Sequence, residues 1–151
     1  MMRWAKTMRR HLAALLDTLF GRRAKETGNS LTGKWGEDVA ARFLKEEGYS
    51  IVARRVRPDR DGDEIDIVAQ RDGVLAIVEV KTRADESFGR PAIAVNRRKR
   101  NALRRGAVAY LHRAGNPRMR TRFDIIEVVG SRDSQTPPVV RHIKGAFGAR
   151  G

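Results

Sequence analysis

The chain has 151 residues, the length of one ordinary domain, and 40% of them are hydrophobic, enough to build a core. It contains no cysteine, which excludes disulfides, zinc–thiolate sites and cysteine nucleophiles and fits the cytoplasmic location that we expect. The 32 Lys and Arg residues against 18 Asp and Glu residues give a formal net charge of +14, so polyanions, above all nucleic acid, are the expected partners. No apolar run approaches the ~20 residues of a membrane span, and we expect none.

Residues 1–30 are predicted to form a basic N-terminal extension, separate from the domain at 31–151. Apolar residues recur in the extension at helical spacing, beside several arginines and lysines. The stretch 21–30 contains helix-breaking residues and divides the extension from the domain. A basic amphipathic helix would suit a membrane surface or DNA, but the pattern has low specificity, and we favour a dispensable extension.

The domain at 31–151 is predicted to combine two helices with five strands. Thr32 can cap the first helix and Gly48 can end it. Apolar periodicity places the helices at 33–47 and 93–113. It places the strands at 49–57, 63–70, 74–82, 122–129 and 139–143. An order α-β-β-β-α-β, antiparallel at first and then with a helical crossover, predicts an α/β fold with a mixed sheet flanked by helices.

The second and third strands are predicted to form a hairpin, because Asp72-Gly73 is a preferred pair for a two-residue turn. With that turn, Asp66 faces Glu79 and Glu64 faces Lys81. Side chains alternate along a strand, so these four share one face of the hairpin. The other face is predicted to be core and carries Ile65, Ile67, Val78 and Val80.

The shared face predicts a metal site. Directly opposed residues have Cβ atoms only ~5 Å apart, so Asp66 and Glu79 would repel each other unless a cation lay between them. Mg²⁺ takes oxygen ligands of this kind, and in phosphodiester hydrolysis it polarises the phosphate and lowers the pKa of a bound water. Lys81 could position or deprotonate that water, or stabilise charge on the phosphate. The alternative is a solvated hairpin face with a Glu64–Lys81 ion pair.

Glu37 lies at the flank of the apolar stripe of the first helix. It could lean over the sheet and complete the site. It could equally stabilise the helix dipole, since it falls near the start of the predicted helix. The histidines, in contrast, lack the spacing of metal ligands and are interpreted as incidental: His11, His112 and His142.

The second predicted helix is strongly basic. From Ser87 to Phe123 the chain has eleven basic residues and no acidic one. This pattern favours a surface that tracks phosphates, although a plain solvated basic face would look alike. Few aromatic residues accompany the charges, which favours recognition of shape and backbone over base stacking. The predicted apolar side of the helix carries Val95, Ala102, Leu103, Val108 and Leu111. The candidate nucleic-acid-binding residues are Arg97, Arg98, Lys99, Arg100 and Arg104.

Glu79-Val80-Lys81, with Asp66 on the preceding strand and Glu37 on the preceding helix, resembles the signature of the PD-(D/E)xK nuclease superfamily. More narrowly, ordered motifs over about 31–147 resemble the YraN family of small bacterial proteins. These motifs include Gly36-Glu37, Gly62-Asp63-Glu64-Ile65-Asp66, Val78-Glu79-Val80-Lys81-Thr82-Arg83, Phe88-Gly89-x-Pro91 and Arg122-Phe123-Asp124. The chain departs from the patterns in two places: Ile65 replaces the proline before Asp66, and Arg55 stands where the family would have Asn.

The resemblance implies a restriction-endonuclease-like fold. By the superfamily pattern, Asp66, Glu79 and Glu37 would bind Mg²⁺ or Mn²⁺, and Lys81 would act in catalysis. The resulting hypothesis is a metal-dependent endonuclease that hydrolyses phosphodiester bonds in DNA, including branched or damaged DNA. A non-catalytic nucleic-acid-binding protein with the same fold is the alternative, and a membrane-surface adaptor acting through residues 1–28 is a third. The sequence leaves open DNA versus RNA and whether the chain forms a homodimer.

Overall fold

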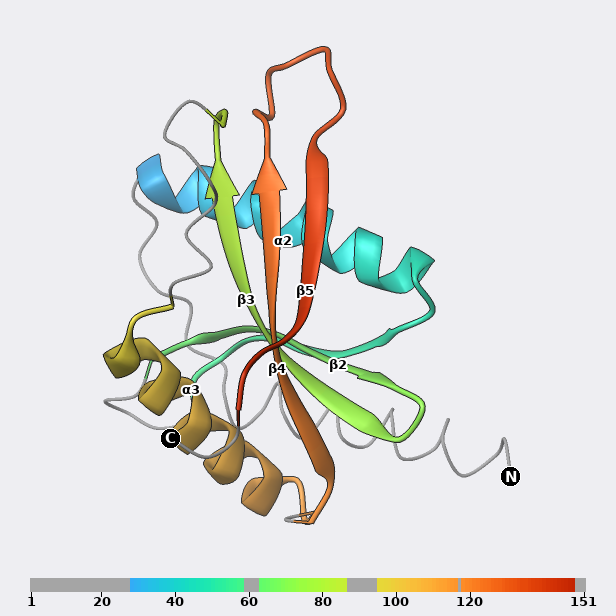
Figure 1. The fold of residues 1–151 in the computed structure, drawn as a ribbon, viewed down its shortest axis with the longest axis vertical. Coiled ribbons are helices and arrows are strands. Elements are labelled where there is room, and N and C mark those ends of the chain that lie inside the picture. Colours follow the sequence, from blue (N-terminus) through green and yellow to red (C-terminus); the bar gives the residue numbers. More distant parts are fainter. Residues whose placement is uncertain (1–27, 59–62, 87–94, 117, 149–151) are drawn as a thin grey trace.

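The computed structural model describes residues 28–58, 63–86, 95–116 and 118–148 (Figure 1). In these ranges the helices are α2 (Gly28–Glu46) and α3 (Arg97–Arg113). The strands are β1 (Ser50–Val56), β2 (Ile65–Arg71), β3 (Val74–Arg83), β4 (Arg120–Val129) and β5 (Val139–Phe147). The predicted order of elements is confirmed, and residues 1–27 of the predicted extension lie outside the described part of the chain.

The five strands form one mixed sheet in the order β1-β2-β3-β4-β5. Strands β3 and β4 run parallel, whereas the other neighbouring pairs are antiparallel. A parallel pair needs a crossover connection, and α3 lies in that connection. The two helices pack with separate hydrophobic clusters, one on each side of the sheet. This arrangement is consistent with the restriction-endonuclease-like α/β fold. Neither helix in the described ranges is long and apolar enough to span a membrane.

Helix α2 confirms one predicted end and corrects the other. It begins at Gly28, so Thr32 lies inside the helix and is not its N-cap. Threonine costs less than about 1 kcal/mol relative to alanine within a helix, which lets the helix run through it. At the C-terminal end, the Tyr49 N–H donates to Leu44 O (2.8 Å) and the Gly48 N–H to Lys45 O (3.0 Å). Gly48 has φ 83°, so this is a Schellman motif with glycine at its left-handed position.

The hairpin turn and its register agree with the prediction. Asp72 and Gly73 both have positive φ, 50° and 74°, as a type I′ turn requires. The pairing of β2 with β3 runs from Arg71↔Val74 to Ile67↔Val78 and ends there. The predicted opposition of Asp66 to Glu79 therefore lies beyond the ladder, where β2 and β3 no longer pair.

The predicted core face of the hairpin is wrong at one residue. Ile67 and Val78 belong to the cluster under α2, with Val80 packed against it. Ile65 instead belongs to the cluster under α3. Strict alternation holds only while a strand stays regular, and at Ile65 β2 has already left the β3 ladder. The start of β2 therefore contributes to the opposite layer of the core.

Helix α3 begins at Arg97, after an Asn96 N-cap whose side chain accepts from the Lys99 N–H at 2.9 Å. The predicted start at 93 lies outside the described residues. The buried residues of the helix recur in pairs four apart: Ala102, Leu103, Gly106, Ala107, Tyr110 and Leu111. Val108 was predicted on this apolar side, but it lies one position past the stripe and is 57% exposed.

Gly106 offers a test of how α3 packs on the sheet. A Cβ at this position would lie 3.4 Å from an Ile65 side-chain carbon and 3.5 Å from one of Pro58, which is ordinary contact. Alanine also loses less backbone entropy than glycine, so Gly106→Ala is expected to raise the free energy of unfolding by about 1 kcal/mol in urea titrations. Gly33→Ala, also helical but with nothing within 4 Å, measures the propensity gain alone. If Gly106→Ala destabilises the protein while Gly33→Ala stabilises it, α3 is packed too tightly to accept a methyl group.

Candidate functional site

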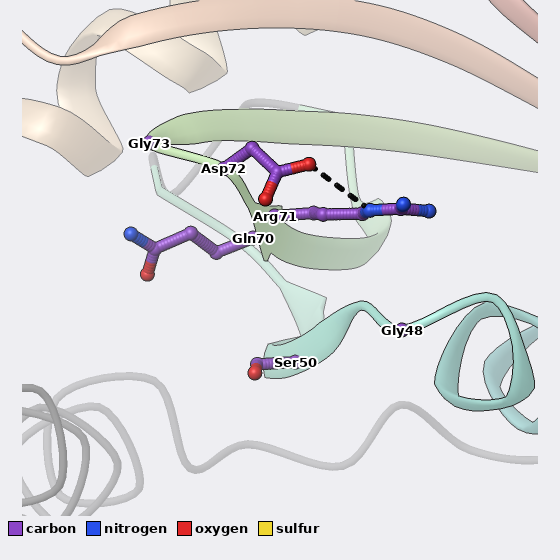
Figure 2. A pocket seen from close by; sticks show the side chains of 6 residues that line it. All are labelled: Gly48, Ser50, Gln70, Arg71, Asp72 and Gly73. Carbon is purple, nitrogen blue, oxygen red and sulfur yellow. Dashed lines mark hydrogen bonds and ion pairs between the residues drawn. The ribbon is translucent and has the colours of Figure 1, made fainter. Parts of the chain in front are cut away.

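A pocket of about 490 Å³ lies beside the hairpin turn (Figure 2). The residues that line it are Gly48, Ser50, Gln70, Arg71, Asp72 and Gly73. Its charged groups are already engaged, because Arg71 Nε lies 3.1 Å from Asp72 Oδ2 and Arg71 Nη1 donates to Glu47 O at 2.6 Å. None of its lining residues belongs to the predicted site, which lies toward the other end of the hairpin.

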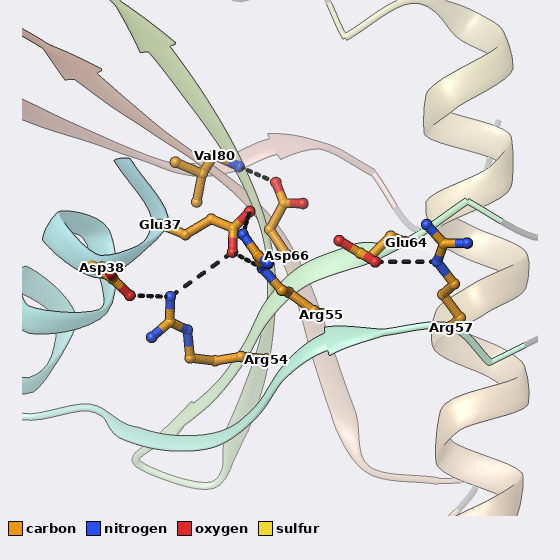
Figure 3. Close-up of polar contacts among 8 residues, drawn as sticks. All are labelled: Glu37, Asp38, Arg54, Arg55, Arg57, Glu64, Asp66 and Val80. Carbon is orange, nitrogen blue, oxygen red and sulfur yellow. Dashed lines mark hydrogen bonds and ion pairs between the residues drawn. The ribbon is translucent and has the colours of Figure 1, made fainter. Parts of the chain in front are cut away.

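Three carboxylates meet beyond the end of the β2–β3 ladder. Glu37 of α2, Asp66 of β2 and Glu64, which directly precedes β2, each place one carboxylate oxygen within 4.8 Å of the other two (Figure 3). Glu37 is almost fully buried, whereas the other two are half-buried. Three oxygen donors this close together form a set that a hard divalent cation can use.

Gly36 allows α2 to come close enough to β3 for this arrangement. A Cβ on Gly36 would lie 1.9 Å from Thr82 Oγ1 and 3.0 Å from Thr82 Cβ. Only glycine fits without displacing the threonine, since real contacts at such distances do not occur. The neighbouring residue, Glu37, is thereby brought to the sheet. It lies well inside α2, which begins at Gly28, and not in the first turn where a dipole role was considered.

Asp66 fills the gap that opens where β2 and β3 stop pairing. Its Oδ2 accepts a 2.7 Å hydrogen bond from the Val80 N–H (Figure 3). Burial raises the pKa of Asp66 to about 8, and the charges of Glu79 and Glu37 act in the same direction, while the Val80 N–H and Lys99 oppose them. The surroundings of Asp66 thus disfavour its negative charge.

Arginines from β1 and the residue after it neutralise the other two carboxylates of the cluster. Arg55 binds both oxygens of Glu37, with Nε at 2.6 Å and Nη2 at 3.3 Å. Arg57 Nε lies 3.1 Å from Glu64 Oε2. Arg54 mainly pairs with Asp38 at 2.7 Å and stays 3.8 Å from Glu37.

Glu79 lies beside the cluster and is held by two lysines. Its Oε1 accepts from Lys81 Nζ at 2.8 Å, and its Oε2 lies 3.2 Å from Lys99 Nζ. Lys99 also donates to the Glu64 backbone oxygen at 3.3 Å. Glu79 is buried and does not join the 4.8 Å set, yet its charge is the second largest cause of the raised pKa of Asp66.

The structure thus brings all four predicted site residues into one region, in two groups. Glu37 and Asp66 belong to the carboxylate cluster, and Glu79 and Lys81 form an adjacent ion pair. The alternative Glu64–Lys81 ion pair is wrong, because Glu64 pairs with Arg57. Glu64 was predicted on the same hairpin face as Asp66, but its place in the carboxylate cluster was not predicted.

Two basic residues of the site were not recognised from the sequence. Lys99 was predicted on the outer nucleic-acid surface, but it reaches Glu79 from the first turn of α3. Arg55 adopts φ 52°, the left-handed region that Asn tolerates better than Arg. The family pattern, with Asn at this position, was the available indication of a special backbone there.

The predicted nucleic-acid-binding residues of α3 differ in exposure and contacts. Arg104 donates to Gly148 O and Asn101 Oδ1, both at 2.9 Å, and its guanidinium lies 5.7 Å from the centre of the Phe147 ring. It therefore ties α3 to the end of β5. Arg97 and Arg98 are exposed, and Arg100 is half-buried.

A second polar cluster, centred on Asp124, joins β4 to β5. Burial acts to raise the pKa of Asp124, but hydrogen bonds from Arg122, His142 and the Gly145 N–H outweigh it and lower the pKa to about 2. The Arg122 bonds are both 2.7 Å, and His142 Nε2 lies 2.8 Å from Asp124 Oδ2. His142, interpreted from the sequence as incidental for lack of metal-ligand spacing, contacts Asp124 and connects two neighbouring strands.

Relatives of the chain are known from several bacteria. The sequence matches the group described as uncharacterised protein family UPF0102 over residues 36–128. A UPF0102 protein of Symbiobacterium thermophilum is 45% identical over 117 residues, which cover 78% of this chain and 96% of the relative. UPF0102 proteins of Trichlorobacter lovleyi and Solibacter usitatus are 40% and 42% identical, covering 80% and 76% of this chain and 92% and 84% of the relatives. With its motifs, its α/β fold and these relatives, the chain belongs to the UPF0102 family, the YraN family that the sequence motifs indicated.

Proposed function

We propose that the chain is a metal-dependent endonuclease that hydrolyses phosphodiester bonds in DNA. The observation that carries the proposal is the convergence of Glu37, Glu64 and Asp66 within 4.8 Å, with Asp66 held between two strands. Carboxylate oxygens are the ligands that Mg²⁺ and Mn²⁺ prefer, so this donor set fits such an ion. The ion would polarise the scissile phosphate and lower the pKa of a bound water.

The residues of the chain have separate roles in this proposal. Asp66 is the central metal ligand, with Glu37 and Glu64 beside it, and Glu79 adds the negative charge that favours a cation there. Lys81 remains 42% exposed although it pairs with Glu79, so its ammonium group can meet a phosphate. It would hold the attacking water or stabilise the charge that develops on the phosphate. Lys99 orients Glu79 from the other side.

DNA is the proposed substrate because the site opens beside a basic helix. Lys99 reaches Glu79 from the first turn of α3, and the exposed Arg97 and Arg98 belong to the same turn. A phosphate backbone held by these arginines would lie next to the carboxylates. Arginine suits this role, since its guanidinium binds phosphate oxygens in pairs. Contacts of this type read backbone shape, which suits branched or damaged DNA better than a specific base sequence.

The test is purified protein with linear, flapped and four-way DNA, each with Mg²⁺, with Mn²⁺ and with chelator. Cleavage that requires the metal supports the proposal, and binding without cleavage on every substrate contradicts it. That second outcome would favour a non-catalytic nucleic-acid-binding protein. One observation favours this alternative: Glu37, Glu64 and Glu79 already have basic partners within 3.2 Å and are neutralised without a metal.

The DNA interface can be tested through salt. Replacing Arg97 and Arg98 together by Gln is expected to weaken binding to all duplex sequences alike. Each lost phosphate contact removes roughly 0.9 from the slope of log affinity against log salt concentration. The matched control replaces Arg118 and Arg120, two exposed arginines beyond the C-terminal end of α3. An unchanged slope in the Arg97 and Arg98 variant would remove the start of α3 from the interface.

A further inference from the structure

Arg55 already places a cation on a carboxylate of the proposed metal centre. Its guanidinium lies side-on to Glu37 and uses both carboxylate oxygens, with contacts of 2.6 and 3.3 Å (Figure 3). A paired contact of this kind is stronger than a single hydrogen bond and fixes the direction of the carboxylate. It also brings a positive charge to the place where a metal ion would need Glu37, and two cations there would repel each other.

Among the ion pairs of the cluster, the Arg55–Glu37 pair is the best protected from water. The Arg55 and Glu37 side chains are 34% and 11% exposed, whereas those of the Arg57–Glu64 pair are 50% and 28% exposed. Exposed ion pairs contribute little and open easily, while a pair shielded from solvent is screened less. Arg55 is therefore the strongest rival that a metal ion would meet at the three clustered carboxylates.

The backbone of Arg55 is strained as well. Its φ of 52° is costly for a side chain with a Cβ, by roughly 1–2 kcal/mol. Such conformations persist where the surroundings determine them, and they gather at functional sites. An ion pair with Glu37 accompanies the conformation of Arg55. Asparagine tolerates positive φ, so Arg55→Asn can remove the guanidinium and keep the backbone conformation at position 55.

We propose that Arg55 competes with the metal ion for Glu37 and thereby limits metal affinity in the absence of substrate. This inference rests on the proposed metal centre. In the metal-free protein the guanidinium neutralises Glu37, and a divalent cation binds fully only when that ion pair opens. Opening the ion pair separates the Arg55 guanidinium from Glu37, and a DNA phosphate can take the place of the carboxylate. Metal binding and DNA binding would consequently favour each other.

The experiment is calorimetric titration of Mn²⁺ into the full chain without DNA. Arg55→Asn is expected to bind Mn²⁺ about tenfold more tightly than wild type, because a hydrogen-bonded charged competitor is lost. Arg54→Asn is the matched control. It removes the same charge from the neighbouring residue with the same exposure, 35% against 34%, but Arg54 stays 3.8 Å from Glu37 and bonds to Asp38. Its gain is expected to stay under about threefold, as for a partly screened charge.

Each result decides between the inference and the proposed function. Equal gains in Arg55→Asn and Arg54→Asn would show that only net charge matters, which overturns the inference and leaves the metal centre standing. Absence of Mn²⁺ binding in all three proteins would overturn both. In a Glu37→Gln background, Arg55→Asn should no longer raise the Mn²⁺ affinity. If it still does, Arg55 acts on a group other than Glu37. Should Arg55→Asn fail to fold, Arg55→Lys keeps the charge without the fork and is still expected to bind Mn²⁺ more tightly than wild type.

Discussion

Replacing Asp66 with alanine is expected to lower metal-dependent DNA cleavage at least about 100-fold, the scale on which enzymes lose rate when one preorganised electrostatic group is removed. Asp66 is influenced by the charges of both Glu37 and Glu79, and alanine removes its carboxylate from the place where β2 and β3 stop pairing. DNA binding should change little, since the exposed arginines of α3 are untouched. Glu79→Ala and Lys81→Ala are likewise expected to lower cleavage while changing DNA binding little.

Alanine at position 66 also leaves the partly buried Val80 N–H without its acceptor, which can cost about 1 kcal/mol of stability or more. Asp66→Asn retains an acceptor oxygen for that N–H and removes only the charge, so its loss of cleavage reports on chemistry alone. Asp38→Ala is the control for acidic residues of α2. Asp38 follows Glu37 directly but is exposed and pairs with Arg54 outside the cluster. Wild-type cleavage in all of the Asp66, Glu79 and Lys81 variants would mean that the reaction occurs elsewhere or comes from a contaminant.

The parts of the fold that could be predicted from the sequence depend on local chemistry. Asp72-Gly73 determines a turn with two positive φ values, and that turn fixes the register as far as Ile67↔Val78. Gly48 ends α2 because a Schellman motif needs a left-handed residue. A helix between β3 and β4 leaves room for the crossover that their parallel pairing needs. For the turn and the helix end, the residues that decide the structure are neighbours in the chain.

The details of the site escaped prediction because they depend on residues far apart in the chain. Extending the hairpin register placed Asp66 opposite Glu79, whereas the ladder ends first and Asp66 turns to the Val80 N–H. Lys99 belongs to the site because α3 packs with its first turn over Glu79, 20 positions earlier in the sequence. Periodicity along a helix gives its buried side but not the strand that lies beneath it. The residue types of the site were therefore predictable, and their pairing was not.

The metal-free protein is expected to lose stability between about pH 4 and pH 8 through Asp66. Burial and the charge of Glu79 raise the pKa of Asp66 from 3.8 to about 8, so the folded state holds this proton more tightly than the unfolded state does. A raised carboxyl pKa contributes stability that is fully present below pH 3.8 and disappears as the pH rises through about 8. Asp66→Asn does not titrate. Its melting temperature should exceed that of wild type at pH 8 and approach it near pH 4.

Mn²⁺ should reverse this order at pH 8. A cation that binds only the native state stabilises it by RT ln(1 + [L]/Kd), about 2.7 kcal/mol at a hundredfold excess over Kd. Wild type offers the ionised Asp66 carboxylate and should gain this stabilisation, whereas Asp66→Asn should gain much less. Thermal melts of both proteins with and without Mn²⁺, at pH 5 and pH 8, give the four comparisons that are needed. Equal Mn²⁺ shifts in the two proteins would place the bound metal away from Asp66. A further outcome is a difference in melting temperature between the two metal-free proteins that is independent of pH. That result would mean that the Asp66 carboxyl is ionised throughout this range, because the Val80 N–H and Lys99 stabilise its charge more than burial destabilises it.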